Sequence, residues 1–92
     1  MNPKNIAFIV NPMAGTKTKN KVNKLIRDLL DKEQFAPTVV VTEYAGHATQ
    51  LAQQFAAEGY YAVVAVGGDG TVNEVASGLR DTDTALGIIP NG

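Results

Sequence analysis

The sequence predicts a three-layer α-β-α domain of the α/β class, in which helices cover both faces of a mainly parallel sheet. Two observations lead to this fold. Short apolar runs rich in strand-forming residues alternate with segments whose apolar residues recur at helical spacing. Each apolar run also passes into small or polar residues, which are typical of strand-to-helix turns. The predicted order is therefore β-α-β-α-β-α-β, with right-handed crossovers.

The first half of the chain supplies two strands and one helix. Residues 6–10 (Ile-Ala-Phe-Ile-Val) form a continuous apolar run, as expected of a strand buried on both faces. Residues 22–30 place apolar side chains at i, i+3, i+4, i+7 and i+8, which predicts one face of a helix. Pro37 is expected to end the segment that holds the first strand and the first helix. Residues 38–42 (Thr-Val-Val-Val-Thr) are predicted to form the second strand.

The second half repeats the alternation. Residues 48–56 have helical spacing, and Gly59 stands where a glycine commonly ends a helix. Residues 62–66 (Ala-Val-Val-Ala-Val) read as a third buried strand. Residues 72–79 predict a third helix, and residues 85–89 predict a fourth strand.

Length and composition restrict the class of protein. Ninety-two residues suffice for one domain, residues 1–92, and a chain that is 45% hydrophobic and 18% charged is not disordered. A net charge of -1 gives no basic excess, so we expect no nucleic-acid partner. The absence of Cys excludes disulfides and thiolate metal sites, and the single His47 excludes a multi-histidine zinc site. No apolar run approaches the ~20 residues that span a bilayer, and we expect a cytoplasmic domain.

The small and polar clusters fall at one edge of the predicted sheet. They begin at Asn11, Thr42, Gly67 and Pro90, each directly after or at the end of a predicted strand. In an open parallel sheet these positions emerge at the carboxyl ends of the strands, where ligands bind. Such loops also need turn residues for purely structural reasons. Several clusters at one edge, one of them with three glycines in four residues, favour a ligand site.

The sharpest motif is Gly67-Gly68-Asp69-Gly70-Thr71. It joins a predicted strand to a predicted helix, so its amides lie at a helix N-terminus, where phosphate groups bind. It is not the dinucleotide fingerprint, because the third glycine would fall at Asn73. It is not a P-loop either, because Lys17 would need a glycine at Asn11. Two interpretations of Asp69 stay open, a magnesium ligand and a turn that braces the loop, and we favour the first.

Four motifs in this order resemble the diacylglycerol kinase catalytic domain, a family of bacterial lipid kinases related to sphingosine and ceramide kinases. The motifs are Asn11-Pro-x-Ala-Gly15, Thr42 with Gly46-His47-Ala48, Gly67-Gly-Asp-Gly-Thr-Val-Asn-Glu-Val75, and Gly87-x-x-Pro90-x-Gly92. The resemblance covers nearly the whole chain. It implies the N-terminal domain of the NAD kinase/diacylglycerol kinase-like fold. NAD kinases carry a similar glycine-rich loop, but Asn73-Glu74 directly after it favours the lipid kinases.

By this resemblance the chain would hold the nucleotide half of a kinase site, with ATP and Mg²⁺ as cofactors. The first loop would line the nucleotide pocket, Thr42 would hydrogen-bond the nucleotide, and residues 68–74 would wrap the phosphates with Asp69 at the metal. The implied nucleotide-binding residues are Asn11, Pro12, Met13, Ala14, Gly15, Thr42, Gly67, Gly68, Asp69, Gly70, Thr71, Val72, Asn73 and Glu74.

Three groups have structural as well as functional interpretations. Thr71-x-x-Glu74 matches a capping box, which predicts Thr71 at the N-cap of the third helix and is compatible with a phosphate role. His47 is interpreted as structural rather than as a catalytic base. The cations of the first helix are interpreted as a solvated face, with contact to a phosphate or an anionic membrane as the alternative. They are Lys17, Lys19, Lys21, Lys24 and Arg27.

The resemblance implies that the parent protein transfers the γ-phosphoryl group of ATP to a lipid hydroxyl, with diacylglycerol as the expected acceptor. In the family the chain continues into a β-rich domain that binds the lipid and carries the general base. We therefore expect residues 1–92 to be the nucleotide-binding domain, with no catalytic residue of its own and no activity alone. Alternatives are an NAD kinase-like metabolite kinase and a non-catalytic nucleotide-binding regulatory module. The oligomeric state is open, a homodimer included.

Overall fold

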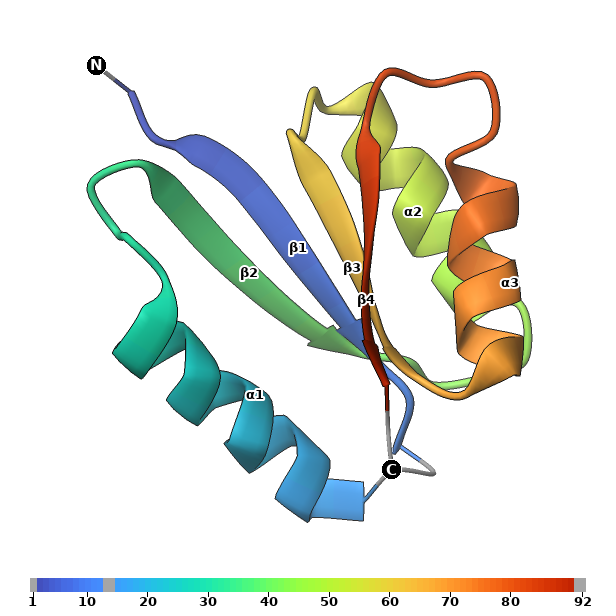
Figure 1. The fold of residues 1–92 in the computed structure, drawn as a ribbon. Coiled ribbons are helices and arrows are strands. Elements are labelled where there is room, and N and C mark those ends of the chain that lie inside the picture. Colours follow the sequence, from blue (N-terminus) through green and yellow to red (C-terminus); the bar gives the residue numbers. More distant parts are fainter. Residues whose placement is uncertain (1, 13–14, 91–92) are drawn as a thin grey trace.

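The computed structural model describes residues 2–12 and 15–90 and has the predicted alternating order (Figure 1). All four strands are parallel and lie in the order β2-β1-β3-β4. The elements are β1 (Lys4–Val10), α1 (Gly15–Leu29), β2 (Phe35–Val41), α2 (His47–Ala57), β3 (Ala62–Gly67), α3 (Asp69–Gly78) and β4 (Ala85–Pro90). The α/β class and the parallel sheet predicted from the sequence are confirmed.

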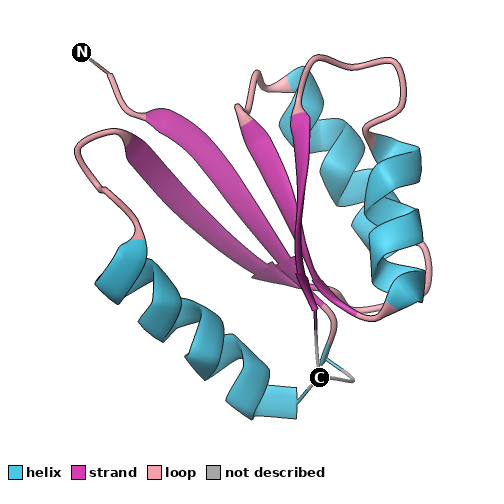
Figure 2. Cartoon of the chain, viewed as in Figure 1, coloured by secondary structure: helices cyan, strands magenta, loops and turns pink. Residues whose placement is uncertain are grey.

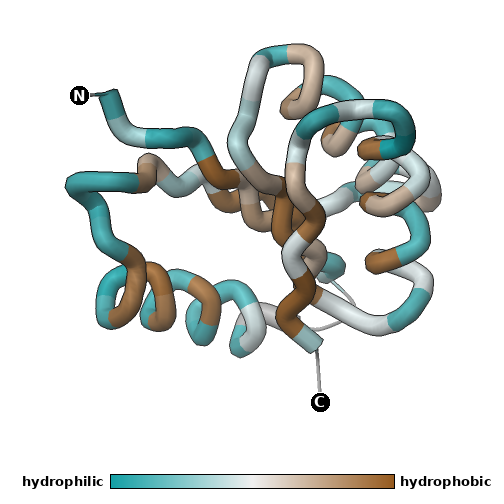
Figure 3. The backbone as a smooth tube through the Cα atoms, turned by 45° about the horizontal axis from the view of Figure 1, so that its top comes forward, coloured by the Kyte–Doolittle hydropathy of each residue, from teal (hydrophilic) through white to brown (hydrophobic). Residues whose placement is uncertain are grey.

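The sheet lies between two helical layers. α1 covers one face, and α2 and α3 lie side by side on the other (Figures 1 and 2). Alternate residues of β1 divide between the two cores: Phe8 and Val10 pack with Val22 and Ile26 of α1, whereas Ile9 packs beneath α2 and α3. Figure 3 shows the apolar segments concentrated in the central strands and recurring along the second half of α1, whereas the first turns of that helix are polar. The continuous apolar run of β1 is therefore explained by burial on both faces.

Three boundaries differ from the sequence prediction. Pro37 lies inside β2, opposite Ile6, rather than ending the preceding unit. β2 is an edge strand, where a residue without an N–H group can be accommodated. α3 begins at Asp69, three residues before the apolar spacing starts. Leu29, assigned to the buried face of the first helix, is 78% exposed, because the side of α1 that faces the sheet carries Val22, Ile26 and then Leu30, and Leu29 lies beside that stripe.

Helix α2 ends as predicted. Gly59 adopts a left-handed conformation with φ of 82°. Its N–H donates to the Ala56 carbonyl and the Tyr60 N–H donates to the Phe55 carbonyl, both at 3.0 Å. This pair of bonds is the Schellman arrangement, which satisfies carbonyls at a helix end and turns the chain into β3.

Gly78 lets α2 and α3 approach closely. A Cβ atom at this position would lie 2.5 Å from the Thr49 carbonyl oxygen and 2.7 Å from the Ala52 Cβ. Both neighbours belong to α2, and Ala52 is itself completely buried. The missing side chain therefore sets the separation of the two helices and, with it, the separation of their N-terminal ends.

We expect Gly78→Ala to lower the free energy of unfolding by about 1–3 kcal/mol, because the added methyl overpacks the contact between α2 and α3. Urea denaturation followed by circular dichroism measures this change. Gly70→Ala is the matched control, since Gly70 also lies in α3 but a Cβ there meets nothing within 4 Å. Equal stability of the two variants would contradict the close contact.

Candidate functional site

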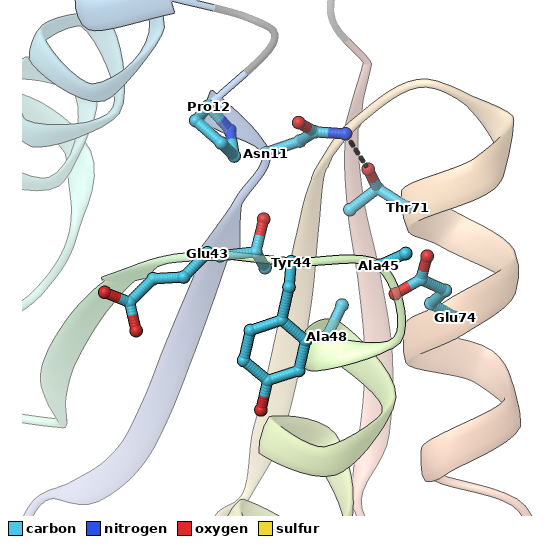
Figure 4. Close-up of a pocket in the computed structure, with 9 residues that line it drawn as sticks. Asn11, Pro12, Glu43, Tyr44, Ala45, Ala48, Thr71 and Glu74 are labelled. Atoms are coloured by element: carbon cyan, nitrogen blue, oxygen red, sulfur yellow. Dashed lines mark hydrogen bonds between the residues drawn. The ribbon is translucent and has the colours of Figure 1, made fainter.

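The loops that follow β1 and β3 meet where the winding of the sheet reverses. From β1 the chain passes to β2 on one side, whereas β3 lies on the other side of β1. Ligands of open α/β sheets bind at the carboxyl ends of the strands at such a reversal. Here the Asn11 Nδ2 donates a hydrogen bond of 3.1 Å to the Thr71 Oγ1 (Figure 4). This bond joins the loop after β1 to the first turn of α3, across 60 residues of sequence.

A pocket of about 370 Å³ opens at this edge, beside the bond between Asn11 and Thr71 (Figure 4). Its walls come from the residues after β1, from the segment between β2 and α2 together with the first turn of α2, and from the first two turns of α3. The lining residues are Asn11, Pro12, Thr42, Glu43, Tyr44, Ala45, Ala48, Thr71 and Glu74. Three segments that the sequence analysis placed at one edge thus converge on one cavity.

The structure distributes the predicted site residues unevenly. Asn11, Pro12, Thr42, Thr71 and Glu74 line the pocket. Residues 67–70 form the turn between β3 and α3, next to the pocket.

Two other predicted residues, both in α3, do not line the pocket. Asn73 is exposed, and the Val72 side chain packs against the core under α2 and α3. Gly15 is the first residue of α1, whereas Met13 and Ala14 lie outside the described residues.

The glycine-rich turn leaves backbone donors at the start of α3. Gly67 has a φ of 156°, and a Cβ there would lie 2.8 Å from the Thr71 Oγ1, so only glycine fits. Within α3 the Val72 N–H donates to the Gly68 carbonyl at 3.1 Å. The N–H groups of Asp69, Gly70 and Thr71 precede that bond and have no acceptor within the helix. Such amides, at the positive end of a helix, suit an anion.

The predicted capping box is wrong. The N-cap of α3 is Gly68, which has no side chain to cap the helix, and Thr71 is the third residue of the helix. Thr71 is only 4% exposed, and its hydroxyl accepts the bond from Asn11. The Glu74 carboxylate accepts a bond from the Gly46 N–H, at 3.1 Å, instead of returning to Thr71. The helix begins earlier than the apolar pattern indicates, and both side chains find partners on other loops.

The wall between β2 and α2 was missed by the sequence analysis, apart from Thr42. Tyr44 stacks on His47, with ring centroids 4.4 Å apart and an interplanar angle of 15°. The Tyr44 hydroxyl donates to the Gln50 Oε1 at 2.6 Å, and the His47 Nδ1 accepts the Glu43 N–H at 3.0 Å. His47 therefore braces this segment, in agreement with its structural interpretation. In the sequence, the signal for this wall was an aromatic residue, Tyr44, two positions after the end of the predicted second strand.

Asp69 is the candidate metal ligand. Its side chain is exposed in the first turn of α3, next to the open amides. Within residues 2–12 and 15–90 no three acidic or histidine side chains come together to hold a metal ion. Magnesium in nucleotide-dependent enzymes is commonly held by one or two carboxylates together with substrate phosphates. The single carboxylate of Asp69 fits that arrangement and does not fit a metal held by protein side chains alone.

Helix α1, which carries the cations, lies on the opposite face of the sheet from α2 and α3 (Figure 1). Lys17, Lys19, Lys21, Lys24 and Arg27 are all exposed. Exposure is what a solvated helix face requires, and it also leaves the side chains accessible to an anionic surface. None of the helices in the described part of the chain has the length and apolar character needed to cross a membrane.

The comparisons with known proteins agree with this geometry. The sequence profile of the diacylglycerol kinase catalytic domain matches residues 5–92. The chain belongs to this family. It is 42% identical over 92 residues to a Streptococcus pneumoniae protein that is provisionally named a lipid kinase, covering 97% of this chain and 31% of that protein. It is 33% identical over 91 residues to the diacylglycerol kinase of Bacillus subtilis, covering 97% of this chain and 30% of that enzyme.

A solved structure of the family has the same fold. A crystal structure of a diacylglycerol kinase from Bacillus anthracis superposes with a TM-score of 0.77 at 31% identity, covering 100% of this chain and 34% of that one. The diacylglycerol kinase-like fold expected from the motifs is therefore confirmed. This member of the family spans about a third of the length of the relatives it matches.

We expect the bond between Asn11 and Thr71 to stabilise the domain as well as to shape the site. Thr71→Val removes the hydroxyl without changing the shape of the side chain, and should lower the free energy of unfolding by about 1 kcal/mol. A double-mutant cycle with Asn11→Ala, measured by urea denaturation, should give a coupling energy of about 0.5–1.5 kcal/mol. Additive effects of the two substitutions would show that the bond does not form in solution.

Proposed function

We propose that the pocket and the glycine-rich turn bind ATP, and that the parent protein transfers its γ-phosphoryl group to the hydroxyl of a lipid, with diacylglycerol as the acceptor. One observation carries this proposal. In a chain of the diacylglycerol kinase family, a pocket of about 370 Å³ adjoins a helix N-terminus with open amides, at the reversal point of a parallel sheet. Pockets of this size accommodate small-molecule ligands.

Different parts of the site suit different parts of a nucleotide. The amides of Asp69, Gly70 and Thr71 would donate to phosphate oxygens, since they have no acceptor in α3. The pocket beside them would take the less charged part of the nucleotide, with Thr42 and Asn11 as hydrogen-bonding side chains in its wall. Val72 would act indirectly, because its N–H is bonded to Gly68 and its side chain packs in the core.

The proposed reaction is a direct displacement at the γ-phosphorus. The acceptor hydroxyl oxygen forms the new P–O bond, the bond to the oxygen that bridges the β- and γ-phosphorus breaks, and ADP leaves. Backbone donors fixed by the fold stabilise the charge on the phosphates without reorganising during the reaction. Asp69 would hold Mg²⁺ jointly with the phosphates, and that ion would supply further charge neutralisation.

The acceptor half of the reaction is proposed to lie outside these 92 residues. Phosphoryl transfer requires the nucleotide, the metal and the acceptor hydroxyl to be held in line. The family relatives are about three times as long as this chain. We therefore propose that further protein binds the lipid and accepts the hydroxyl proton, and that residues 1–92 alone have no kinase activity.

Substitution of Gly70 tests the phosphate site. Gly70→Asp should weaken ATP binding by about a hundredfold or more, because it adds a negative charge where a phosphate is proposed to bind. The fold should tolerate it, since a Cβ at Gly70 has no neighbour within 4 Å and an acidic residue is favourable in the first turn of a helix. Isothermal titration calorimetry measures the affinity, and circular dichroism checks the fold.

Gly70→Asn is the matched control, because it has nearly the same size as aspartate and no charge. We expect it to weaken ATP binding by about tenfold or less. ATP binding by Gly70→Asp that equals binding by the unsubstituted protein would overturn the assignment of the glycine-rich turn to phosphate.

The acceptor is identified by phosphate transfer. With radiolabelled ATP and Mg²⁺, the intact parent protein should label diacylglycerol, and residues 1–92 alone should label nothing. A sphingoid base and NAD are offered in parallel. Label on NAD would show that the nucleotide site serves a metabolite kinase, whereas ATP binding without any transfer would indicate a regulatory module. Turnover by residues 1–92 would contradict the proposed division of the site.

A further inference from the structure

We propose that Glu74 is a positioning residue that fixes the wall of the pocket formed by residues 43–46, rather than a ligand of the nucleotide phosphates. This inference rests on the proposed nucleotide site, and it assigns a different role to a residue that the family resemblance places among those around the phosphates. Glu74 already has two hydrogen-bond partners at the start of α2.

Glu74 is bonded to the N-terminal end of α2 at two points. Its carboxylate Oε1 accepts the Gly46 N–H at 3.1 Å, and its backbone carbonyl accepts the Thr49 hydroxyl at 2.8 Å. Gly46 is the N-cap of α2 and has no side chain with which to cap the helix. The Gly46 N–H precedes the first bond of α2, which the Gln50 N–H donates to the Gly46 carbonyl, so Glu74 supplies from a neighbouring helix an acceptor that α2 does not provide.

The charge of Glu74 suits this position. A carboxylate is favourable at the positive end of a helix, and Glu74 is half-buried against the first residues of α2. A carboxylate close to phosphate groups is repelled unless a cation lies between them. Glu74 is three to five residues beyond the open amides of Asp69, Gly70 and Thr71, which places its backbone about 4.5–7.5 Å further along the helix axis. Its attachment to Gly46 keeps the negative charge directed at α2.

The bond acts directly on the pocket. Glu43, Tyr44 and Ala45 form one wall, and Gly46 is the next residue along the chain. Figure 4 shows the Glu74 carboxylate beside Ala45 at this wall. One helical turn earlier in α3, Thr71 holds Asn11 on the other side of the pocket. The helix whose N-terminus is proposed to bind the phosphates thus holds two walls of the pocket with two side chains on one face.

Two substitutions separate positioning from direct contact. Glu74→Gln keeps an oxygen acceptor for the Gly46 N–H and removes the charge, whereas Glu74→Ala removes the acceptor. In the intact protein, hydrogen–deuterium exchange of the segment 43–48 should be about tenfold faster in Glu74→Ala and within about threefold of the unsubstituted protein in Glu74→Gln. The dissociation constant of Mg-ATP should rise about tenfold in Glu74→Ala and at most about threefold in Glu74→Gln.

The controls keep the outcomes distinct. Ser77→Ala, an exposed position on the same helix, should change neither readout. If Glu74→Ala does not fold, Glu74→Met replaces it, because methionine has a similar length and no carboxylate. The exchange measurement needs no nucleotide, so failure of the unsubstituted protein to bind Mg-ATP would refute the proposed function and still leave the bond to Gly46 measurable.

Three results would overturn the proposal. Direct contact with phosphate or metal would be indicated if Glu74→Gln lost as much Mg-ATP affinity as Glu74→Ala while hydrogen–deuterium exchange of the segment 43–48 in Glu74→Gln stayed unchanged. Unchanged exchange in Glu74→Ala would show that the bond does not hold the wall. Faster exchange in Glu74→Ala with unchanged affinity would show that the position of the wall does not matter for the nucleotide.

Discussion

The bond between Asn11 and Thr71 is the contact on which the geometry of the site depends. It closes the reversal point of the sheet by joining the loop after β1 to the first turn of α3. Thr71 occupies the space that a side chain on Gly67 would fill, so the glycine and the buried hydroxyl require each other. A larger residue at Gly67 would displace Thr71, and with it Asn11. The same contacts of Thr71, with Gly67 and with Asn11, thus set both the shape of the glycine-rich turn and the width of the pocket.

Close packing of α2 and α3 extends this constraint to the other side of the pocket. Ala52 and Gly78 present almost no side-chain volume to each other, so the helix axes approach closely and their N-terminal ends lie together. Only at this separation can a side chain of α3 reach the first residues of α2, as Glu74 does at Gly46. Tight apolar packing in the middle of the helices therefore determines polar contacts at their ends, as expected of interiors packed to crystal-like density.

The resulting site suits chemistry that depends on placement. Phosphoryl transfer requires little covalent participation by the protein, and most of its acceleration comes from positioning and from fixed donors around the phosphates. A backbone turn held by buried contacts supplies such donors without side-chain entropy to lose. Asp69 differs from its neighbours in this turn because its exposed side chain carries a charge, which is what the proposed role as a shared metal ligand requires. The backbone donors and the charged side chain therefore lie within the same three residues, Asp69, Gly70 and Thr71.

Some of this protein was determined by the sequence alone. Strand runs and helical spacing are local patterns, and parallel strands necessarily place the loops after Val10, Val41 and Gly67 at one edge. The fold and the general location of the site could therefore be predicted. The four family motifs could also be identified in the sequence, because each is a short contiguous segment.

Only the tertiary structure decided which partners the polar side chains take. Thr71 and Glu74 satisfy a capping pattern within their own helix, yet they bond to residues 60 and 28 positions away. The exposure of Leu29 likewise depends on which side of α1 faces the sheet, and the inclusion of Pro37 in β2 depends on which strand forms the sheet edge. The physical reason is the same in each case. Sequence spacing determines the face on which a side chain lies, whereas the partner it meets depends on how the helices and strands pack in space.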